Sequence, residues 1–218
     1  MATLTQKSDS ISYNPPSESY WTLSGVKHRG ENQTYRVFGQ MTPSMTQDDL
    51  IEKYGLKIPN SQLVWALTDR AYELRNSSPN EAERLRNFLR QCFRQRSHTS
   101  SRAIYMPEGE IDRAAHNYGT PEQYFLDANL VGVDGRIKDI PNKKVLVSIL
   151  GTDDVGKINK VSQWVNGTGS SISRVNLKPN SVEVQRTVGF YANVVRLGFG
   201  CGGDLAYVGP SLRVERIE

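Results

Sequence analysis

Residues 143–179 read KKVLVSILGTDDVGKINKVSQWVNGTGSSISRVNLKP and contain three regular patterns in succession. Residues 145–150 are apolar at nearly every position, which is typical of a strand covered on both faces. Residues 155–165 repeat apolar side chains at three- and four-residue spacing, which indicates a helix. Residues 172–177 predict a second strand, which ends before Pro179. The segment therefore predicts a strand–helix–strand unit with two parallel strands and a right-handed crossover.

Polar residues and a glycine mark the ends of the helix in this unit. Thr152 can cap the helix start, and Asp153 and Asp154 place negative charge in the first turn, where the helix dipole favours it. Gly167 can end the helix. The two carboxylates also suggest a metal or acid–base site, but no His, Glu or Cys with ligand spacing lies nearby. The helix-terminal role is therefore the favoured interpretation.

In outline, the strand–helix–strand unit resembles half of a ferredoxin-like domain. Such domains occur in small linker proteins of light-harvesting antennae and in many RNA-binding folds. The resemblance covers about a sixth of the chain and includes no diagnostic motif. It therefore identifies no family, and implies only that a linker or an RNA-binding role is compatible with the pattern.

The composition is that of a folded protein with a lean apolar core. The chain has 218 residues, 37% hydrophobic and 23% charged, with room for one large domain or two small ones. A net charge of +4 permits an anionic partner without requiring one. The sequence contains neither a secretory signal nor the roughly 18 apolar residues of a membrane helix. We therefore expect a cytoplasmic or intracellular protein without membrane insertion, whose two cysteines, Cys92 and Cys201, are reduced.

Three segments are expected along the chain of this α+β protein. Residues 1–18 are polar and include Pro15 and Pro16, so they predict an extended arm that lies on a partner or stays disordered. Residues 19–135 predict a β-hairpin followed by a helical domain. Residues 140–218 predict an α/β domain, in which additional antiparallel strands follow the strand–helix–strand unit. The domain boundary falls in the turn-rich connector between them.

Local signals place the elements of the second segment. Residues 20–41 alternate apolar and polar side chains around the turn sequence HRGEN, which indicates a hairpin. A Ser-Pro-Asn-Glu capping box with proline at the first helical position predicts one of the helices that follow. The expected helix starts are Thr46, Ser61 and Ser78. Two more helices are expected, over residues 108–118 and after the Thr-Pro-Glu-Gln sequence at residues 120–123.

A glycine-rich run near the C-terminus, GFGCGG at residues 198–203, formally matches the G-x-G-x-x-G fingerprint of dinucleotide sites. No helical pattern follows it. Only 15 residues remain after Gly203, too few for the acidic partner about 20 positions on. The run therefore predicts a hairpin turn in which glycine supplies positive φ, without nucleotide affinity.

The sequence contains no familiar catalytic or metal motif. Cys201 needs a base to act as a nucleophile, and His28, His98 and His116 stand at no recognisable spacing from it. The same residues fit no zinc signature. HExxH, GxSxG and Walker sequences do not occur. We expect no cofactor and no metal, and an enzyme with an unrecognised site is the third functional alternative.

The most biased segment is residues 84–102, RLRNFLRQCFRQRSHTSSR, which contains six arginines and no acidic residue. Arg86, Arg90 and Arg94 are spaced by four and share one face of a helix. Such a face can be solvated, can bind phosphate groups, or can dock on another protein. Arginine rather than lysine dominates, and arginine suits bidentate carboxylate and phosphate contacts as well as aromatic contacts.

These observations favour a non-enzymatic structural or assembly protein, a subunit or linker of a larger complex such as a virion component or an antenna-type linker. Its expected partners are other protein subunits, which it contacts through the N-terminal arm and the arginine-rich helix. The residues expected to bind the partner are Arg86, Arg90, Arg94, Arg96, Pro15 and Pro16. The alternative is a nucleic-acid-binding protein that uses the basic helix.

Overall fold

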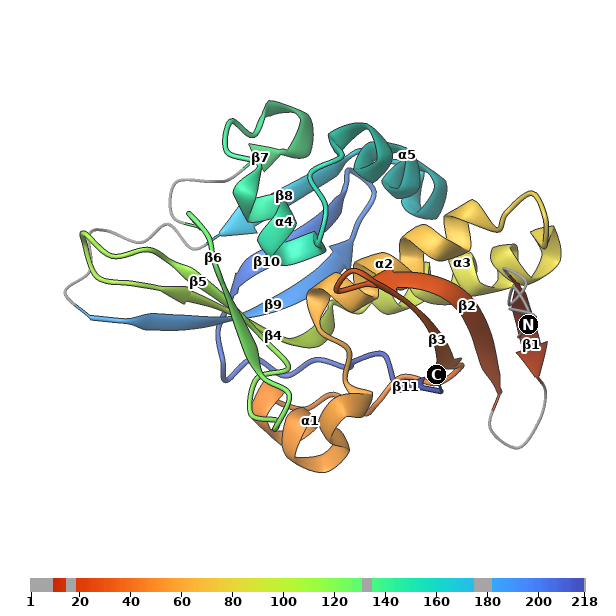
Figure 1. Cartoon of the computed structure of the whole chain (residues 1–218), viewed down its shortest axis with the longest axis horizontal. Coiled ribbons are helices and arrows are strands. Elements are labelled where there is room, and N and C mark those ends of the chain that lie inside the picture. The colour runs from red at the N-terminus through yellow and green to blue at the C-terminus, as the bar shows by residue number, and fades with distance from the viewer. Residues whose placement is uncertain (1–9, 15–18, 131–134, 175–181, 218) are drawn as a thin grey trace, which may run out of the picture.

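The computed structural model describes residues 10–14, 19–130, 135–174 and 182–217 and confirms the predicted α+β class (Figure 1). The helices are α1 (Gln47–Tyr54), α2 (Ser61–Glu73), α3 (Pro79–Arg94), α4 (Lys144–Leu150) and α5 (Val155–Asn166), with short 3-10 turns η1 (Gly55–Lys57) and η2 (Ile137–Asp139). The strands are β1 (Ile11–Asn14), β2 (Tyr20–His28), β3 (Glu31–Phe38), β4 (Ser97–Tyr105), β5 (Arg113–His116), β6 (Tyr124–Asp127), β7 (Gly135–Arg136), β8 (Ser170–Arg174), β9 (Val184–Ala192), β10 (Leu197–Gly203) and β11 (Val214–Arg216).

Two sheets enclose a layer of helices. The smaller sheet has the order β1-β2-β3-β11, and the larger sheet has the order β6-β5-β4-β9-β10-β8-β7. Neighbouring strands are antiparallel, except that β8 and β10 run parallel. Helix α2 contacts β2 on one side and β4 and β9 on the other, and α3 lies between β1 and β9 (Figure 1). Helices α2 and α3 therefore pack on one face of the larger sheet, whereas α1 contacts β4 through Arg102.

The hairpin and the first three helices form where local signals predict them. Strands β2 and β3 meet at the two-residue turn Arg29-Gly30, where φ is +54° and +80°. Helix α1 begins after Thr46, whose side chain accepts the backbone N–H of Asp49, and ends at Gly55. The cap of α2 is Asn60, one residue before the expected Ser61. Helix α3 begins with proline in its first turn, although the Ser78 side chain makes no capping bond.

The strand predicted at residues 145–150 is wrong, because this segment is helix α4. Five of its residues are buried, whereas Val147 is 43% exposed. The segment therefore has one solvent-exposed side, as an amphipathic helix does. Gly151 ends the helix with φ +74°, and its N–H bonds the Val147 carbonyl. A short apolar run cannot be assigned to strand or helix by periodicity alone, and here the glycine cap was the better signal.

The rest of that unit is partly as predicted. Helix α5 forms, ends at Gly167 and is capped by Asp154 rather than Thr152; Asp154 Oδ1 accepts the N–H of Lys157 at 2.9 Å. Strand β8 follows, although its parallel neighbour is β10 and not the segment at residues 145–150. The end of the predicted second strand, at residues 175–177, lies outside the described residues.

The helices expected over residues 108–118 and after residue 120 are also wrong. These segments contain strands β5 and β6, which pair with each other. Asn117 and Gly119 between them have φ of +54° and +74°, and Thr120 Oγ1 donates to the Asn117 carbonyl at 2.6 Å. The Thr-Pro-Glu-Gln sequence thus closes a turn. Pairing of β5 with the preceding strand β4 decides this region over the local helix signal.

Of the predicted N-terminal arm, residues 1–18, the structure describes residues 10–14. Within it, β1 pairs with β2, Ile11 is buried, and the Tyr13 ring lies 5.2 Å from Trp21. Pro15 and Pro16 lie outside the described residues. The domain boundary expected near residues 131–141 stays a prediction. Strands from both sides of that segment share the larger sheet.

Within the described ranges, none of the helices is both long and apolar enough to cross a membrane.

Candidate functional site

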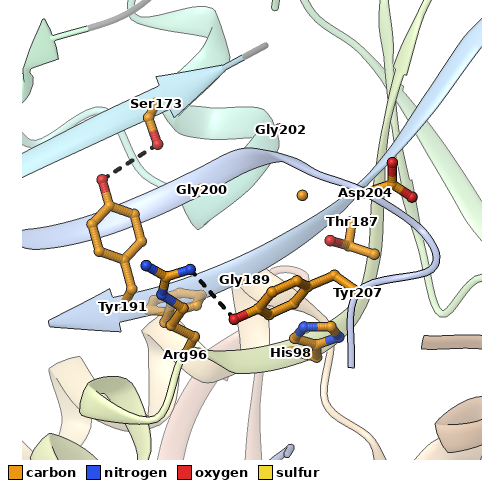
Figure 2. A pocket seen from close by; sticks show the side chains of 12 residues that line it. Arg96, His98, Ser173, Thr187, Gly189, Tyr191, Gly200, Gly202, Asp204 and Tyr207 are labelled. Atoms are coloured by element: carbon orange, nitrogen blue, oxygen red, sulfur yellow. Dashed lines mark hydrogen bonds between the residues drawn. The ribbon is translucent and has the colours of Figure 1, made fainter. Parts of the chain in front are cut away.

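The candidate site is a cavity of about 350 Å³ on the face of the larger sheet opposite helices α2 and α3. One cross-strand row crosses its floor: Ser173 on β8 is opposite Gly200, Gly200 is opposite Gly189 on β9, and Gly189 is opposite His98 on β4. Three strand spacings separate the two outer residues, about 14 Å. Since the two inner positions have no side chain, the row is hollow in the middle. We call this hollow the glycine trough (Figure 2).

Irregular pairing on both sides of β9 shapes the trough. On β10 the pairing passes from Gly200 to Gly203 while β9 advances by two residues, so β10 carries a bulge. On β4 the pairing passes from His98 to Arg102 over the same two residues of β9. Extra residues bend a strand and increase its local twist. The sheet is therefore irregular at the level of the glycines, beside the cavity.

The hairpin turn predicted at residues 198–203 is wrong, because the glycine run is strand β10. None of its glycines has a positive φ. Alternation explains the run instead: Phe199 and Cys201 are buried on the helix side, while Gly200 and Gly202 line the trough. The sequence signal for a strand is this period of two, in which glycine alternates with a buried residue, and it competes with the general preference of glycine for turns.

Two of these glycines are required by close approach of a neighbouring side chain. A Cβ atom at Gly198 would lie 2.0 Å from the Tyr191 ring, which covers that residue, and a Cβ atom at Gly203 would lie 2.1 Å from Thr187 Oγ1. At Gly200 the nearest atom to a Cβ is 3.6 Å away, an ordinary contact distance. A Cβ atom at Gly189 would lie 3.0 Å from the Ser97 carbonyl oxygen. Of these four glycines, only Gly200 therefore has room for a Cβ atom at ordinary contact distances.

Gly203→Val is expected to lower the free energy of unfolding by about 1–3 kcal/mol, because the new side chain overlaps the buried Thr187. Urea denaturation measures the loss. Adding Thr187→Ala, which removes Oγ1, should recover part of it. If the double variant is no more stable than Gly203→Val, backbone conformation rather than side-chain overlap is the cause of the loss.

Aromatic and polar side chains form the walls of the trough. On one side the Tyr191 hydroxyl lies 3.3 Å from Ser173 Oγ. On the other side Arg96 donates to the Tyr207 hydroxyl at 3.4 Å, and the Tyr207 ring stacks on His98 with the centroids 5.9 Å apart (Figure 2). Arg96 itself has φ +59°, which is uncommon for a residue with a side chain. Two tyrosines thus flank a floor of peptide planes.

The titratable groups near the trough are suited to binding rather than to catalysis. His98 is 4% exposed, and burial lowers the pKa of its imidazole, which is therefore neutral at physiological pH. Its Nδ1 has no hydrogen-bond partner among the described residues. Burial raises the pKa of the Cys201 thiol to about 12, which makes it unreactive, and its side chain faces the helices. The Ser173 hydroxyl contacts Tyr191 rather than a base.

The predicted partner-binding arginines are distributed over different contacts. Arg86 pairs with Glu83 at 2.7 Å and lies 5.9 Å from the Trp164 ring. Arg90 is half-buried, and its Nε has no hydrogen-bond partner among the described residues. Arg94 is exposed. Arg96 is the one member of the predicted set that lines the trough, and Pro15 and Pro16 lie outside the described residues.

The other residues singled out by sequence have structural surroundings. His116 Nε2 donates to the Ser148 carbonyl at 2.9 Å, while its Nδ1 lies 2.7 Å from Ser101 Oγ. Cys92 and Cys201 are both free and buried. No group of three or more His, Cys, Asp or Glu side chains in the described part of the chain could hold a metal ion.

Comparison with known proteins adds no function to this geometry. No protein family, curated protein or solved structure matches the chain.

Proposed function

We propose that the protein is a non-enzymatic subunit of a larger assembly, and that the glycine trough receives an aromatic side chain of a partner protein. The observation that supports this best is the row from Ser173 to His98, whose two central residues are glycines. Peptide planes without side chains make a flat floor, and a ring can lie on it. Partner-binding energy in protein complexes concentrates where such a side chain enters a pocket.

The size and walls of the trough fit one ring. Its volume of about 350 Å³ is at the lower end of ligand pockets. Tyr191 and Tyr207 stand on either side, so a ring between them gains aromatic contacts of about 0.5–1.5 kcal/mol each beyond its burial. Arg96 lies beside Tyr207 and can bind a carboxylate that flanks the partner's aromatic residue.

Exposed apolar residues in the loops that adjoin the strands and the tyrosine wall of the trough favour a protein partner over a nucleic acid. Val194 and Val195, in the turn that joins β9 and β10, are 92% and 71% exposed. Val208 follows Tyr207 and is 54% exposed. Such residues gain stability when another protein covers them, whereas a phosphate backbone offers them no apolar surface.

Nucleic-acid binding is the second candidate, because Arg96 and Tyr207 also suit a stacked base. Single-stranded nucleic acids bind on tyrosines with arginines beside them. The basic helix α3 ends next to the trough, since Arg96 follows its last residue, Arg94. The experiment below therefore includes a nucleotide probe.

Gly200→Val is expected to abolish binding in the trough while the protein still folds. A Cβ atom at Gly200 meets no atom closer than 3.6 Å, and the φ of Gly200 is not positive, so we expect the strand to accommodate valine. Isotope-labelled protein should bind N-acetyl-tryptophanamide with a dissociation constant on the order of 1 mM. The amide signals of Gly189, Gly200 and Gly202 report this in wild type. N-acetyl-leucinamide, which has no ring, should bind more weakly.

Matched variants separate the trough from the basic helix. Gly169→Val is a suitable control, because Gly169 is exposed and a Cβ there meets nothing within 4 Å. Arg96→Gln should weaken assembly of the tagged chain in its native cells, whereas Arg94→Gln should not. Stronger binding of adenosine monophosphate than of the tryptophan amide would support the nucleic-acid candidate. Assembly that survives Gly200→Val but not Arg94→Gln would place docking on α3 and contradict the proposal.

A further inference from the structure

A second cavity, of about 460 Å³, lies at the closed end of the β2–β3 hairpin, away from the trough. The hairpin, the segment from α1 to α2, the β5–β6 turn and β11 all contribute to its lining. Its lining includes the polar and charged residues His28, Arg29, Tyr35, Lys57, Asn60 and Asn117. Four elements distant in sequence therefore bring polar groups to one place.

The hydrogen bonds of His28 leave one ring nitrogen available as an acceptor. The Tyr35 hydroxyl donates its only proton to Gln33 Oε1, so it accepts from His28 Nδ1, 3.2 Å away. In the neutral imidazole Nδ1 therefore carries the proton and Nε2 carries the lone pair. His28 is 8% exposed, and its Nε2 makes no hydrogen bond of normal geometry with a described residue, although the side chain of Asn60 lies close enough to raise the pKa of the ring. A buried acceptor of this kind is stabilised by a ligand that donates to it.

Unpaired positive charge lies along the same cavity. Arg29 and Lys57 have no ion-pair partner among the described residues, whereas the cavity's Glu215 pairs with Arg36 at 3.0 Å, and its Arg216 lies 3.7 Å from Glu31. Glu122 is the remaining charged group in the lining. Two cations and one carboxylate leave a net charge of +1, which favours an anion.

The backbone at Arg29 gives a further reason to expect a function for its side chain. Arg29 and Gly30 both have positive φ, as in a type I′ turn, where Asn-Gly is the favoured pair. Arginine is disfavoured at the first position, because a side chain strains a backbone with positive φ. Its guanidinium lies 4.2 Å from the centroid of the Tyr124 ring, and the Tyr124 hydroxyl contacts Asn60 at 3.4 Å. The strained turn thus holds a cation beside the cavity.

We propose that this cavity binds a small hydroxylated carboxylate or phosphate, with its oxyanion on Arg29 and Lys57 and a hydroxyl donated to His28 Nε2. Both candidate ligands carry a hydroxyl group and an oxyanion. They differ in whether the oxyanion is a carboxylate or a phosphate. Asn60 and Asn117, whose side chains bond each other at 2.8 Å, supply further polar groups in the lining. Burial lowers the pKa of His28 to about 4, with Arg29 as the second cause, so the acceptor stays available at neutral pH.

The probes are lactate and glycerol 1-phosphate, each compared with a molecule that lacks one group. Acetate lacks the hydroxyl of lactate, and lactamide and glycerol lack the charge. Lactate or glycerol 1-phosphate should shift the His28 ring signals in NMR titrations and bind at least tenfold more tightly than its uncharged counterpart. The tighter of the two identifies the oxyanion. Equal binding of lactamide and lactate, or no binding of either anion up to its solubility limit, would overturn the proposal.

Arg29→Asn separates a ligand-binding role from a structural one. Asparagine is favoured in this turn, so the melting temperature should stay the same or rise, while anion binding weakens roughly tenfold or more. Lys57→Gln is a second variant outside the turn, with the same expected loss of binding. Lys27→Gln changes the net charge equally, but Lys27 is exposed and does not line the cavity, so binding should be retained. A lower melting temperature with unchanged anion affinity in Arg29→Asn would show a structural role only.

Discussion

Between pH 7 and pH 5 the free energy of unfolding should fall by roughly 2 kcal/mol for each of two buried histidines, His28 and His116. Burial lowers the pKa of both imidazoles from 6.5 to about 4. The unfolded chain therefore binds protons at a pH where the folded chain does not, and protons favour unfolding. Above pH 6.5 both states are mainly unprotonated at these rings, so the histidines do not reduce stability. As the pH falls from 6.5 to about 4, protonation of the unfolded chain lowers the free energy of unfolding progressively.

Local geometry explains why neither ring accepts a proton easily. His116 is fully buried and already donates from Nε2 to a backbone carbonyl, so its Nδ1 accepts from Ser101. For His28, burial is the largest cause of the lowered pKa, followed by the positive charge of Arg29. A proton on either ring has no carboxylate to stabilise it in these contacts.

Urea denaturation at pH 7, 6 and 5 measures this loss, and the ring proton signals of the two histidines report the pKa values directly. In His28→Gln the dependence of stability on pH should be less steep, because the contribution of His28 is lost while those of His116 and His98 remain, whatever the absolute stability of the variant. The slope is therefore the informative quantity. A folded-state titration of both rings near pH 6.5 would contradict the prediction.

The parts of the fold that sequence predicted are those fixed by neighbouring residues. Thr46 and Gly55 begin and end α1 within one short segment, and Arg29-Gly30 closes the hairpin. In each case the signal is a backbone conformation or a capping bond that involves residues fewer than about five apart. Such signals do not depend on which distant strand the segment meets.

The errors occur where pairing with other strands, rather than a local signal, decides the outcome. Strand β5 forms because it pairs with β4 and β6, against a local capping-box signal near residue 120. The glycine run was assigned to a turn because its neighbours across the sheet, Gly189 and Ser173, lie about 10 and 30 residues away in sequence. Loop closure over such distances leaves no local pattern. The trough could therefore be found only once the register of four strands was known.

The arginine-rich helix shows the same limit. Four-residue spacing correctly placed Arg86, Arg90 and Arg94 on one helix, but the contacts of each depend on other elements. Arg86 is engaged by Glu83 and Trp164, and Arg96 points to Tyr207, 111 residues away. The spacing therefore predicts the shared helix but not the contacts that each arginine makes with other elements, and the role of these arginines in partner binding stays a prediction.

Phe199→Ala is expected to lower the free energy of unfolding by about 3–5 kcal/mol, the other large effect. The Phe199 ring is 0% exposed and lies 5.8 Å from Trp65 and 5.3 Å from Phe190, centroid to centroid. Truncation removes these contacts and leaves a cavity between β10 and α2. The midpoint of urea unfolding measures the loss.

The adjacent residue provides the control, because Gly200→Val adds a side chain one position along the same strand. Its Cβ meets only ordinary contacts, and valine favours strands, so the stability of this variant should equal or slightly exceed that of wild type. Successive residues of a strand point to opposite faces. If Phe199→Ala unfolds the protein while Gly200→Val leaves it intact, β10 separates packing on its helix side from the trough on its other side. Comparable losses in both variants would mean that the glycine face is also packed, and the trough could not accept a ring.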